Sequence, residues 1–440
     1  MITAIALTEL SLWWPAGYTR PPGWLVFLAV VLVLFPLSRL HSLRPSTKSA
    51  HSIFLVVILA LLLITFANEI HERTRIVPEW DYLAFWLYGK VAAQGQDFYL
   101  PQNYHQAMSG MTYSKDFQDE ILDVGMRYLP PTIFMFLPLG WMDQGTGLAY
   151  WYALQLLALA AAIWLLWKEF MPALGWAGLA ACASLTLLFW PTHMSFHVAQ
   201  TIPMLLLFAL LFWRHRTRGV SGIWIIAGFF VKPILGILFL FSVWKRQWKA
   251  MLFAALALLA AVVATIAVFG LRPFASYGSH GPLDRFALKL YVQTVNQSLF
   301  SWVLRLTRDN LDRPVSFFNP VFVTLALLLL GITVWLLYRA RKSTQDDVEL
   351  ALLLPLGLLL YPNTLNSYAM LLLVPMMVIW KKRDILPGGE YIAVFYIAST
   401  FGLIGQSPKT YFLAFAMNWV AMAALSYWFH RPKSDPATGF

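Results

Sequence analysis

Apolar runs separated by short polar segments occupy most of this chain, and their lengths predict helices that cross a membrane. A helical span needs about 20 apolar residues, and nine runs approach or reach that length. The predicted spans are residues 24–38, 53–66, 148–167, 173–190, 201–213, 250–269, 318–338, 391–404 and 411–429.

The composition agrees with this pattern. Of the 440 residues, 59% are hydrophobic and 12% are charged, with a mean hydropathy of +0.64, and a soluble domain cannot hide that much apolar surface. We expect an all-α polytopic membrane protein of roughly 10–13 transmembrane segments, folded as one domain over residues 1–440. The first 23 residues lack the basic stretch of a cleavable signal peptide. The single cysteine, Cys182, excludes an intrachain disulfide.

Positive charge is concentrated at the ends of the predicted spans. The net charge is +11, yet no soluble element carries a basic face with stacking aromatics, so nucleic acid is not an expected partner. Basic loops stay in the cytoplasm, which leaves the long polar loops 71–127 and 271–316 on the external side of the plasma (inner) membrane. The basic clusters are Arg39/Arg44/Lys48, Arg214/Arg216/Arg218, Lys245/Arg246/Lys249, Arg339/Arg341/Lys342, Lys381/Lys382/Arg383 and Arg431/Lys433.

Three apolar segments are interrupted. Residues 220–244 contain Lys232-Pro233 between basic flanks, and residues 348–380 repeat this arrangement around YPNTLNSY (361–368). Proline breaks a helix, and a lysine inside the membrane is costly unless it faces a polar cavity. We predict two hairpins that enter and leave on one side, and a re-entrant or interfacial segment at 128–142. Broken helices at membrane depth line protein or a wet cavity, so a buried polar site is expected.

Asp81 is the most informative polar residue, in the stretch PEWDYLAFWLYGKVAAQGQDFYLP (78–101). A helix that begins at Asp81 would carry Phe85, Tyr88 and Ala92 on the same face. The helix dipole would then favour the charged carboxylate, which can take a proton from a sugar hydroxyl as a general base. A helix cap explains the residue equally well on spacing alone.

Other polar residues also allow two interpretations. Asp97 follows Gly95 in a turn, so a structural role is favoured. His193 and His197 have the i, i+4 spacing of metal ligands, but no carboxylate or third nitrogen ligand is apparent nearby, which favours hydrogen-bonded histidines or contacts to a lipid phosphate. The acidic group at 119–123 resembles a solvated face, with a divalent-ion site as the alternative.

The second external loop is basic around NQSLFSW (296–302). Positive charge beside the outer leaflet attracts a phosphate head group, although ordinary loop charge explains any one of these residues. Asn296, Gln297 and Ser298 are more specific, because three hydrogen-bonding side chains lead into an apolar stretch. No phosphate-binding glycine loop, zinc spacing or serine-hydrolase elbow is found in the chain.

In this order, the features resemble glycosyltransferase family 87, the membrane-embedded C-type glycosyltransferases that include polyprenyl-phosphate-mannose-dependent mannosyltransferases. The resemblance covers most of residues 55–380. Its matching segments are WDYLAFWLYGKVAAQGQDFYLP (80–101), YLPPTIFMFLPLGWM (128–142), HVAQTIPMLLLFALLFWRHRTRG (197–219), the Lys-Pro hairpin at 228–249 and NQSLFSWVLR (296–305).

The resemblance implies a C-type glycosyltransferase bundle with Asp81 as the catalytic base. A polyprenyl-phosphate-linked hexose, with mannose favoured, would enter from the outer leaflet. A hydroxyl of a lipid or glycan acceptor would then attack its anomeric carbon with inversion. Neither a nucleotide nor a metal or other cofactor is expected. The expected substrate-binding residues are Arg127, Tyr128, Asn296, Gln297, Tyr368 and His280.

One departure from the family concerns the donor phosphate. Members usually have a histidine beside the tyrosine of the late hairpin, whereas Ser367 precedes Tyr368 here. His280 or an external arginine could substitute, and Lys232 is expected to stabilise its hairpin rather than touch substrate. A transporter or flippase of lipid-linked saccharide is the alternative function. It predicts an internal repeat that the sequence does not display. A catalytically inactive scaffold of the same fold is the third possibility.

Overall fold

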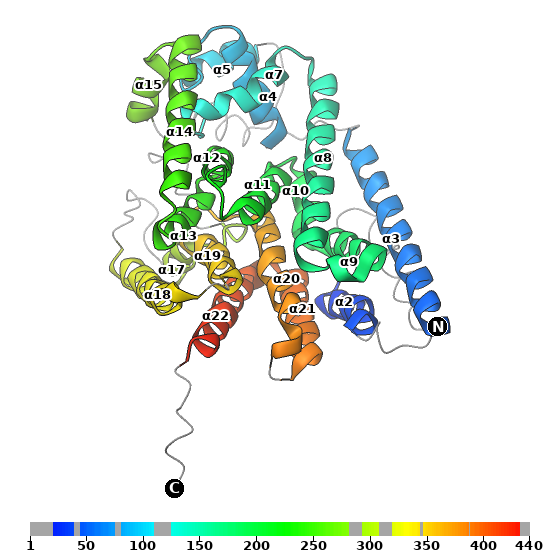
Figure 1. The fold of residues 1–440 in the computed structure, drawn as a ribbon. Helices are drawn as coiled ribbons and strands as arrows, with labels where there is room; N and C mark the ends of the chain where they lie inside the picture. Colours follow the sequence, from blue (N-terminus) through cyan, green and yellow to red (C-terminus); the bar gives the residue numbers. More distant parts are fainter. Residues whose placement is uncertain are drawn as a thin grey trace.

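The computed structural model describes residues 21–38, 45–74, 81–109, 125–280, 293–307, 319–343, 346–386 and 388–431. Within these ranges every regular element is a helix, and β pairing is limited to a single bridge between Asn296 and Leu365. The all-α class predicted from the sequence is confirmed (Figure 1).

Each predicted span corresponds to one helix or to one broken pair of helices. The helix boundaries follow the apolar runs within a few residues, with two exceptions. Helix α3 extends well beyond the predicted span at both ends, and the pair α9–α10 continues beyond residue 190 to His197. The helices are α2 (Gly23–Ser38), α3 (Pro45–Thr74), α8 (Gln144–Phe170), α9 (Gly175–Leu188) with α10 (Trp190–His197), α11 (Ile202–His215), α14 (Trp248–Phe269), α18 (Pro320–Arg339), α21 (Gly389–Gln406) and α22 (Tyr411–Phe429).

The chain is a multi-pass membrane protein. Among the described residues, five helices are long and apolar enough to cross a membrane, and a sixth span results if α9 and α10, bent by 59°, are taken together. Among the described residues, most of the other apolar helices have 10–17 residues, and α21 has 18. The predicted 10–13 segments therefore require these shorter helices, which prolines and glycines interrupt.

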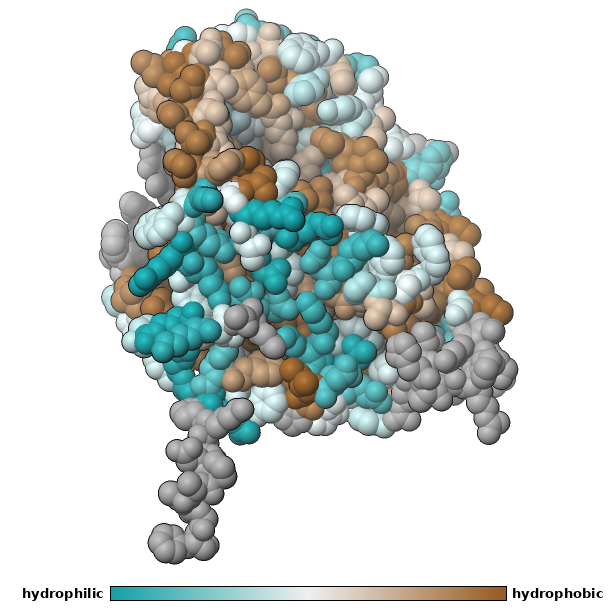
Figure 2. Space-filling model, in the orientation of Figure 1, coloured by the Kyte–Doolittle hydropathy of each residue, from teal (hydrophilic) through white to brown (hydrophobic). Residues whose placement is uncertain are grey.

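Two long helices present most of their apolar surface to the outside. Only 11% of the most apolar stretch of α14 and 17% of that of α18 is buried in the protein. Leu252, Leu256 and Leu259 of α14 are each more than half exposed. The side of the molecule where α14 runs is accordingly hydrophobic in Figure 2. Such a surface is stable in lipid and not in water.

Both predicted hairpins are present and broken near their middle. Lys232 has extended backbone (φ −153°, ψ 128°) between two helical segments, because Pro233 lacks the amide hydrogen that a continuous helix requires. In the second hairpin, called the late hairpin below (residues 347–381), residues 361–365 separate the two arms. The segments are α12 (Ser221–Val231), η4 (Pro233–Leu238) and α13 (Phe239–Trp244), then α19 (Asp347–Leu360), η6 (Asn366–Leu372) and α20 (Leu373–Lys381).

Ion pairs join the base of one hairpin to the end of α11. Arg216 lies 3.1 Å from Asp346 (Nε to Oδ1) and 2.9 Å from Asp347 (Nη2 to Oδ1), and the Lys381 ammonium lies 2.9 Å from the other Asp347 oxygen. Figure 2 shows a hydrophilic surface around α13, α19 and α20, in contrast to the apolar surface along α14. The network ties the hairpin to the bundle at the end opposite its tip.

Short helices cover one end of the bundle. They are α4 (Asp81–Ala93), α5 (Pro101–Ala107), α7 (Ile133–Gly140) with the preceding η2 (Pro130–Thr132), and α15 (Arg272–His280); Figure 1 shows them together at the top. Helices α4 and α7 approach closely, since a Cβ on Gly89 would lie 2.1 Å from the Phe136 carbonyl oxygen and one on Gly140 would lie 2.1 Å from the Gly89 oxygen. Only glycine allows this contact.

Gly89→Ala is therefore expected to push α4 away from α7 and to destabilise the protein by about 1–3 kcal/mol, the usual cost of overpacking. The measurement is the thermal unfolding temperature of the detergent-solubilised protein. Gly331→Ala in α18 is the control, because nothing lies within 4 Å of a Cβ there. Equal unfolding temperatures for the two variants would contradict the close packing.

Candidate active site

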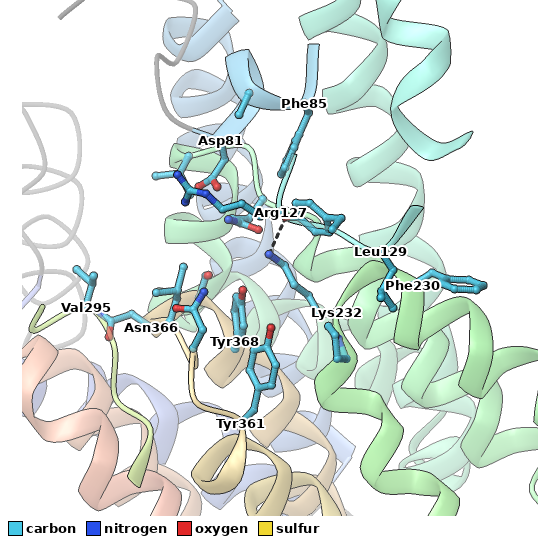
Figure 3. Close-up of a pocket in the computed structure, with 18 of the residues that line it drawn as sticks. Asp81, Phe85, Arg127, Leu129, Phe230, Lys232, Val295, Tyr361, Asn366 and Tyr368 are labelled. Carbon is cyan, nitrogen blue, oxygen red and sulfur yellow. Dashed lines mark hydrogen bonds between the residues drawn. The ribbon is translucent and has the colours of Figure 1, made fainter. Parts of the chain in front are cut away.

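A cavity of about 570 Å³ lies between the short end helices and the tips of the two hairpins (Figure 3). Its walls come from segments far apart in the sequence. These segments are the start of α4, residues 127–129, the end of α10, the break between α12 and η4, residues 293–295 and residues 361–368. A polar cavity among broken helices is the site that the sequence pattern predicted.

Asp81 occupies the first turn of α4, as predicted, and its carboxylate faces the cavity with Ala84, Phe85 and Tyr88 beside it. Protein surrounds the group on its other sides, and this burial raises the pKa of the Asp81 carboxyl. The positive charge of Lys232, a hydrogen bond from the Gln200 side chain and the charge of Arg127 oppose that increase. Burial exceeds these opposing effects, so the pKa of Asp81 is raised and Asp81 is a stronger base than an exposed aspartate.

Gln200 reaches Asp81 from a sharp turn after α10. Ala199 has a φ of +55°, a left-handed conformation that costs energy for a residue with a side chain. Two hydrogen bonds hold the turn. The Trp151 indole donates to the Ala199 carbonyl at 2.7 Å, and the backbone N–H of Gln200 donates to the Ser195 carbonyl at 2.7 Å. Strain supported in this way directs Gln200 into the cavity, and nothing in the local sequence pattern indicated it.

Lys232 lines the cavity at the break of the first hairpin. Its ammonium donates a hydrogen bond to the Tyr128 hydroxyl at 2.7 Å and lies 4.6 Å and 5.3 Å from the ring centroids of Tyr128 and Tyr368 (Figure 3). The extended backbone at the proline break turns this side chain toward the cavity. We expected Lys232 only to stabilise its hairpin, whereas its ammonium is positioned to meet a ligand.

Three predicted substrate-binding residues, Arg127, Tyr128 and Tyr368, also line the cavity. The late hairpin contributes more residues than the sequence indicated, because Tyr361, Asn363, Asn366 and Ser367 surround the cavity together with Tyr368. Polar residues in a helix break at membrane depth are the signal that could have identified the two asparagines.

Asn296 and Gln297 do not line the cavity. The Asn296 amide donates to the Pro362 carbonyl at 2.9 Å, and the Gln297 side chain donates to Thr294 and accepts from the Phe412 amide. The Asn296 side chain and the backbone amide of Gln297, which donates to the Thr364 carbonyl at 2.8 Å, hold the segment 362–364 in position. The neighbouring Val295 reaches the cavity. His280 is the last residue of α15, and its side chain lies outside the described part of the chain.

Two other polar residues have structural partners. Asp97 accepts hydrogen bonds from the Tyr99 amide (3.0 Å) and the Ser276 hydroxyl (2.6 Å), in line with the structural role favoured for it. His193 is hydrogen-bonded, as expected, to the Leu187 carbonyl and to Glu69 at 2.6 Å. The sequence pattern missed this carboxylate because it lies on the distant helix α3. The acidic group at 119–123 lies outside the described residues.

The fold and the cavity together define a multi-pass membrane protein with a polar site inside a helical bundle. A family model described as glycosyltransferase family 87 matches residues 127–375, more than half of the chain. The chain belongs to this family and is a membrane glycosyltransferase. Searches of curated proteins and of solved structures give no match. The matched segment contains Arg127, Lys232 and residues 361–368 of the late hairpin but begins after Asp81.

Proposed function

We propose that this glycosyltransferase transfers a hexose, mannose by preference, from a polyprenyl-phosphate donor to a hydroxyl of a lipid or glycan acceptor. The observation that carries the proposal is one carboxylate in a cavity with two cationic side chains, Asp81 with Lys232 and Arg127. A phosphate leaving group needs positive charge, and an attacking hydroxyl needs a base. The cavity provides both.

Each side chain has a distinct part in the proposed reaction. Asp81 takes the proton of the acceptor hydroxyl, whose oxygen forms a bond to the anomeric carbon from the face opposite the phosphate. The bond from that carbon to the phosphate oxygen breaks, and polyprenyl phosphate leaves with the electron pair. The anomeric carbon of the transferred sugar then has the inverted configuration. Lys232 and Arg127 stabilise the negative charge of the phosphate as it departs.

The proposed site faces the exterior of the plasma membrane. The basic clusters at the span ends support this orientation, because Lys and Arg are retained in the cytoplasm. The hairpin base formed by Asp347 and Lys381 would then lie on the cytoplasmic side, and the cavity would be reached from the outer leaflet, where a polyprenyl chain can remain in lipid.

The proposal is tested with purified protein in vesicles that contain polyprenyl-phosphate mannose and a lipid extract as acceptor source. We expect release of polyprenyl phosphate and formation of an acceptor product whose mass, read by mass spectrometry, is increased by one hexose. A parallel set contains the same donor without acceptor extract, and movement of intact donor between leaflets is measured in both. Movement of donor with no covalent transfer would overturn the proposal in favour of a transporter.

A further inference from the structure

Four side chains at the cavity carry buried polar atoms that have no hydrogen-bond partner within the described residues. The atoms are the Oε1 of Gln200, the Oδ1 of Asn363, the Oδ1 of Asn366 and the hydroxyl of Tyr368. Gln200, Asn366 and Tyr368 are no more than 5% exposed. A buried polar group without a partner is costly, and such groups are uncommon in folded proteins. Because these four side chains line the same cavity, a ligand bound there would supply the missing partners.

The chemistry of these atoms differs from that of the cationic side chains. Lys232 and Arg127 offer only hydrogen-bond donors, which suit a phosphate. The amide oxygens of Asn363 and Asn366 are acceptors, and the Tyr368 hydroxyl both donates and accepts. An ionised phosphate has no proton to give to an amide oxygen. The partner that satisfies this group of atoms carries hydroxyls, as a sugar does.

The late hairpin holds these atoms in a fixed arrangement. The backbone amide of Asn366 donates to the Val295 carbonyl at 3.0 Å, and that of Tyr368 donates to Leu365 at 3.0 Å. The rings of Tyr361 and Tyr368 are stacked with an interplanar angle of 26°. A preorganised wall of this kind loses little entropy when a ligand binds.

The hydroxyl-binding wall lies next to the cation proposed to bind the phosphate. The ring of Tyr368 is 5.3 Å from the Lys232 ammonium, and Figure 3 shows Asn366 and Tyr361 on the same side of the cavity as Tyr368. In a sugar phosphate, the ring is attached directly to the phosphate group. A phosphate held by Lys232 would therefore bring the hydroxyls of its own sugar to this wall.

We infer that Asn363, Asn366 and Tyr368 bind the hydroxyls of the donor sugar and so determine which sugar the enzyme accepts. The inference rests on the proposed function and adds the residues that discriminate among donors. A site built to hydrogen-bond a hydroxyl rejects analogues that lack it, because its own polar groups are then left unpaired.

The test compares the binding of two lipids to the full-length protein in detergent, polyprenyl-phosphate mannose and bare polyprenyl phosphate. We expect the wild type to bind the sugar-bearing lipid more tightly. Asn366→Leu and Tyr368→Phe should each reduce that preference by about tenfold, the effect of one lost hydrogen bond. Both variants should bind bare polyprenyl phosphate as the wild type does, which also demonstrates that they are folded.

Gln155→Leu is the matched control, since Gln155 is a buried amide of α8 outside the cavity lining. It should leave both affinities unchanged. Variants that keep the full preference for the sugar-bearing lipid, or a wild type without such a preference, would overturn the inference and leave the proposed phosphate contacts intact. Failure of the wild type to bind bare polyprenyl phosphate would instead overturn the proposed function and the inference with it.

Discussion

Asp81→Asn is expected to lower the rate of sugar transfer by about 10²–10⁴-fold, the usual contribution of a general base. The amide has nearly the shape of the carboxylate but cannot accept the proton of the acceptor hydroxyl. Because only the proton transfer is removed, the affinity for polyprenyl-phosphate mannose should change much less than the turnover. The measurement is product formation in proteoliposomes, with kcat and KM determined separately.

The control for this experiment is Asp384→Asn, which removes the same charge from an exposed position. The Asp384 carboxylate is 78% exposed and belongs to the hairpin base, away from the cavity. Asp384→Asn should transfer sugar at the wild-type rate. A correctly inserted Asp81→Asn protein that retains full activity would remove Asp81 from the mechanism.

Lys232→Met is expected to raise KM for the polyprenyl-phosphate donor by about 10- to 100-fold, because a charge-assisted hydrogen bond contributes about 1.5–3 kcal/mol. Methionine retains the approximate length of the side chain and its contact with the aromatic rings, so the cavity should keep its shape. The exposed Lys409 provides the matched control, Lys409→Met, since it does not line the cavity. A Lys232→Met enzyme with the wild-type KM would exclude the proposed phosphate contact.

The same variant should also change the pH dependence of transfer. Asp81 acts as a base only when ionised, so activity is lost as the pH falls through its pKa. The charge of Lys232 lowers that pKa, and its removal raises the pKa further. The acidic limb of the pH–rate profile should therefore move to higher pH in Lys232→Met and stay in place in Lys409→Met. A shift toward lower pH would show that the two groups are not coupled as proposed.

The proposed division of the cavity separates two tasks. In the proposed function, Arg127 and Lys232 would contact the phosphate that every polyprenyl-phosphate donor carries, and the wall formed by Asn363, Asn366 and Tyr368 would contact the sugar. Under this proposal, substitution at the wall would change the accepted sugar while the leaving-group chemistry is kept.

The sequence alone predicted the features that depend on local chemistry. Apolar runs predicted the helices because a bilayer admits only segments that satisfy their own backbone hydrogen bonds. Lys232-Pro233 and YPNTLNSY (361–368) marked the two breaks, since proline and clustered polar side chains end a helix at that depth. Asp81 was identified as the first residue of a helix. The family was also recognised from the order of these motifs.

Only the tertiary structure decided which polar residues meet. Asn296 and Gln297 were expected at the cavity, but they form hydrogen bonds to residues 362–364 of the late hairpin instead. Gln200, which was not expected there, lines the cavity because of the strained turn at Ala199. Lys232 proved to face the cavity. These assignments depend on which distant segments pack together, and local patterns do not encode that pairing. The length of each apolar run determined where the helices lie in the chain, whereas long-range packing and hydrogen bonds determined which side chains share a site.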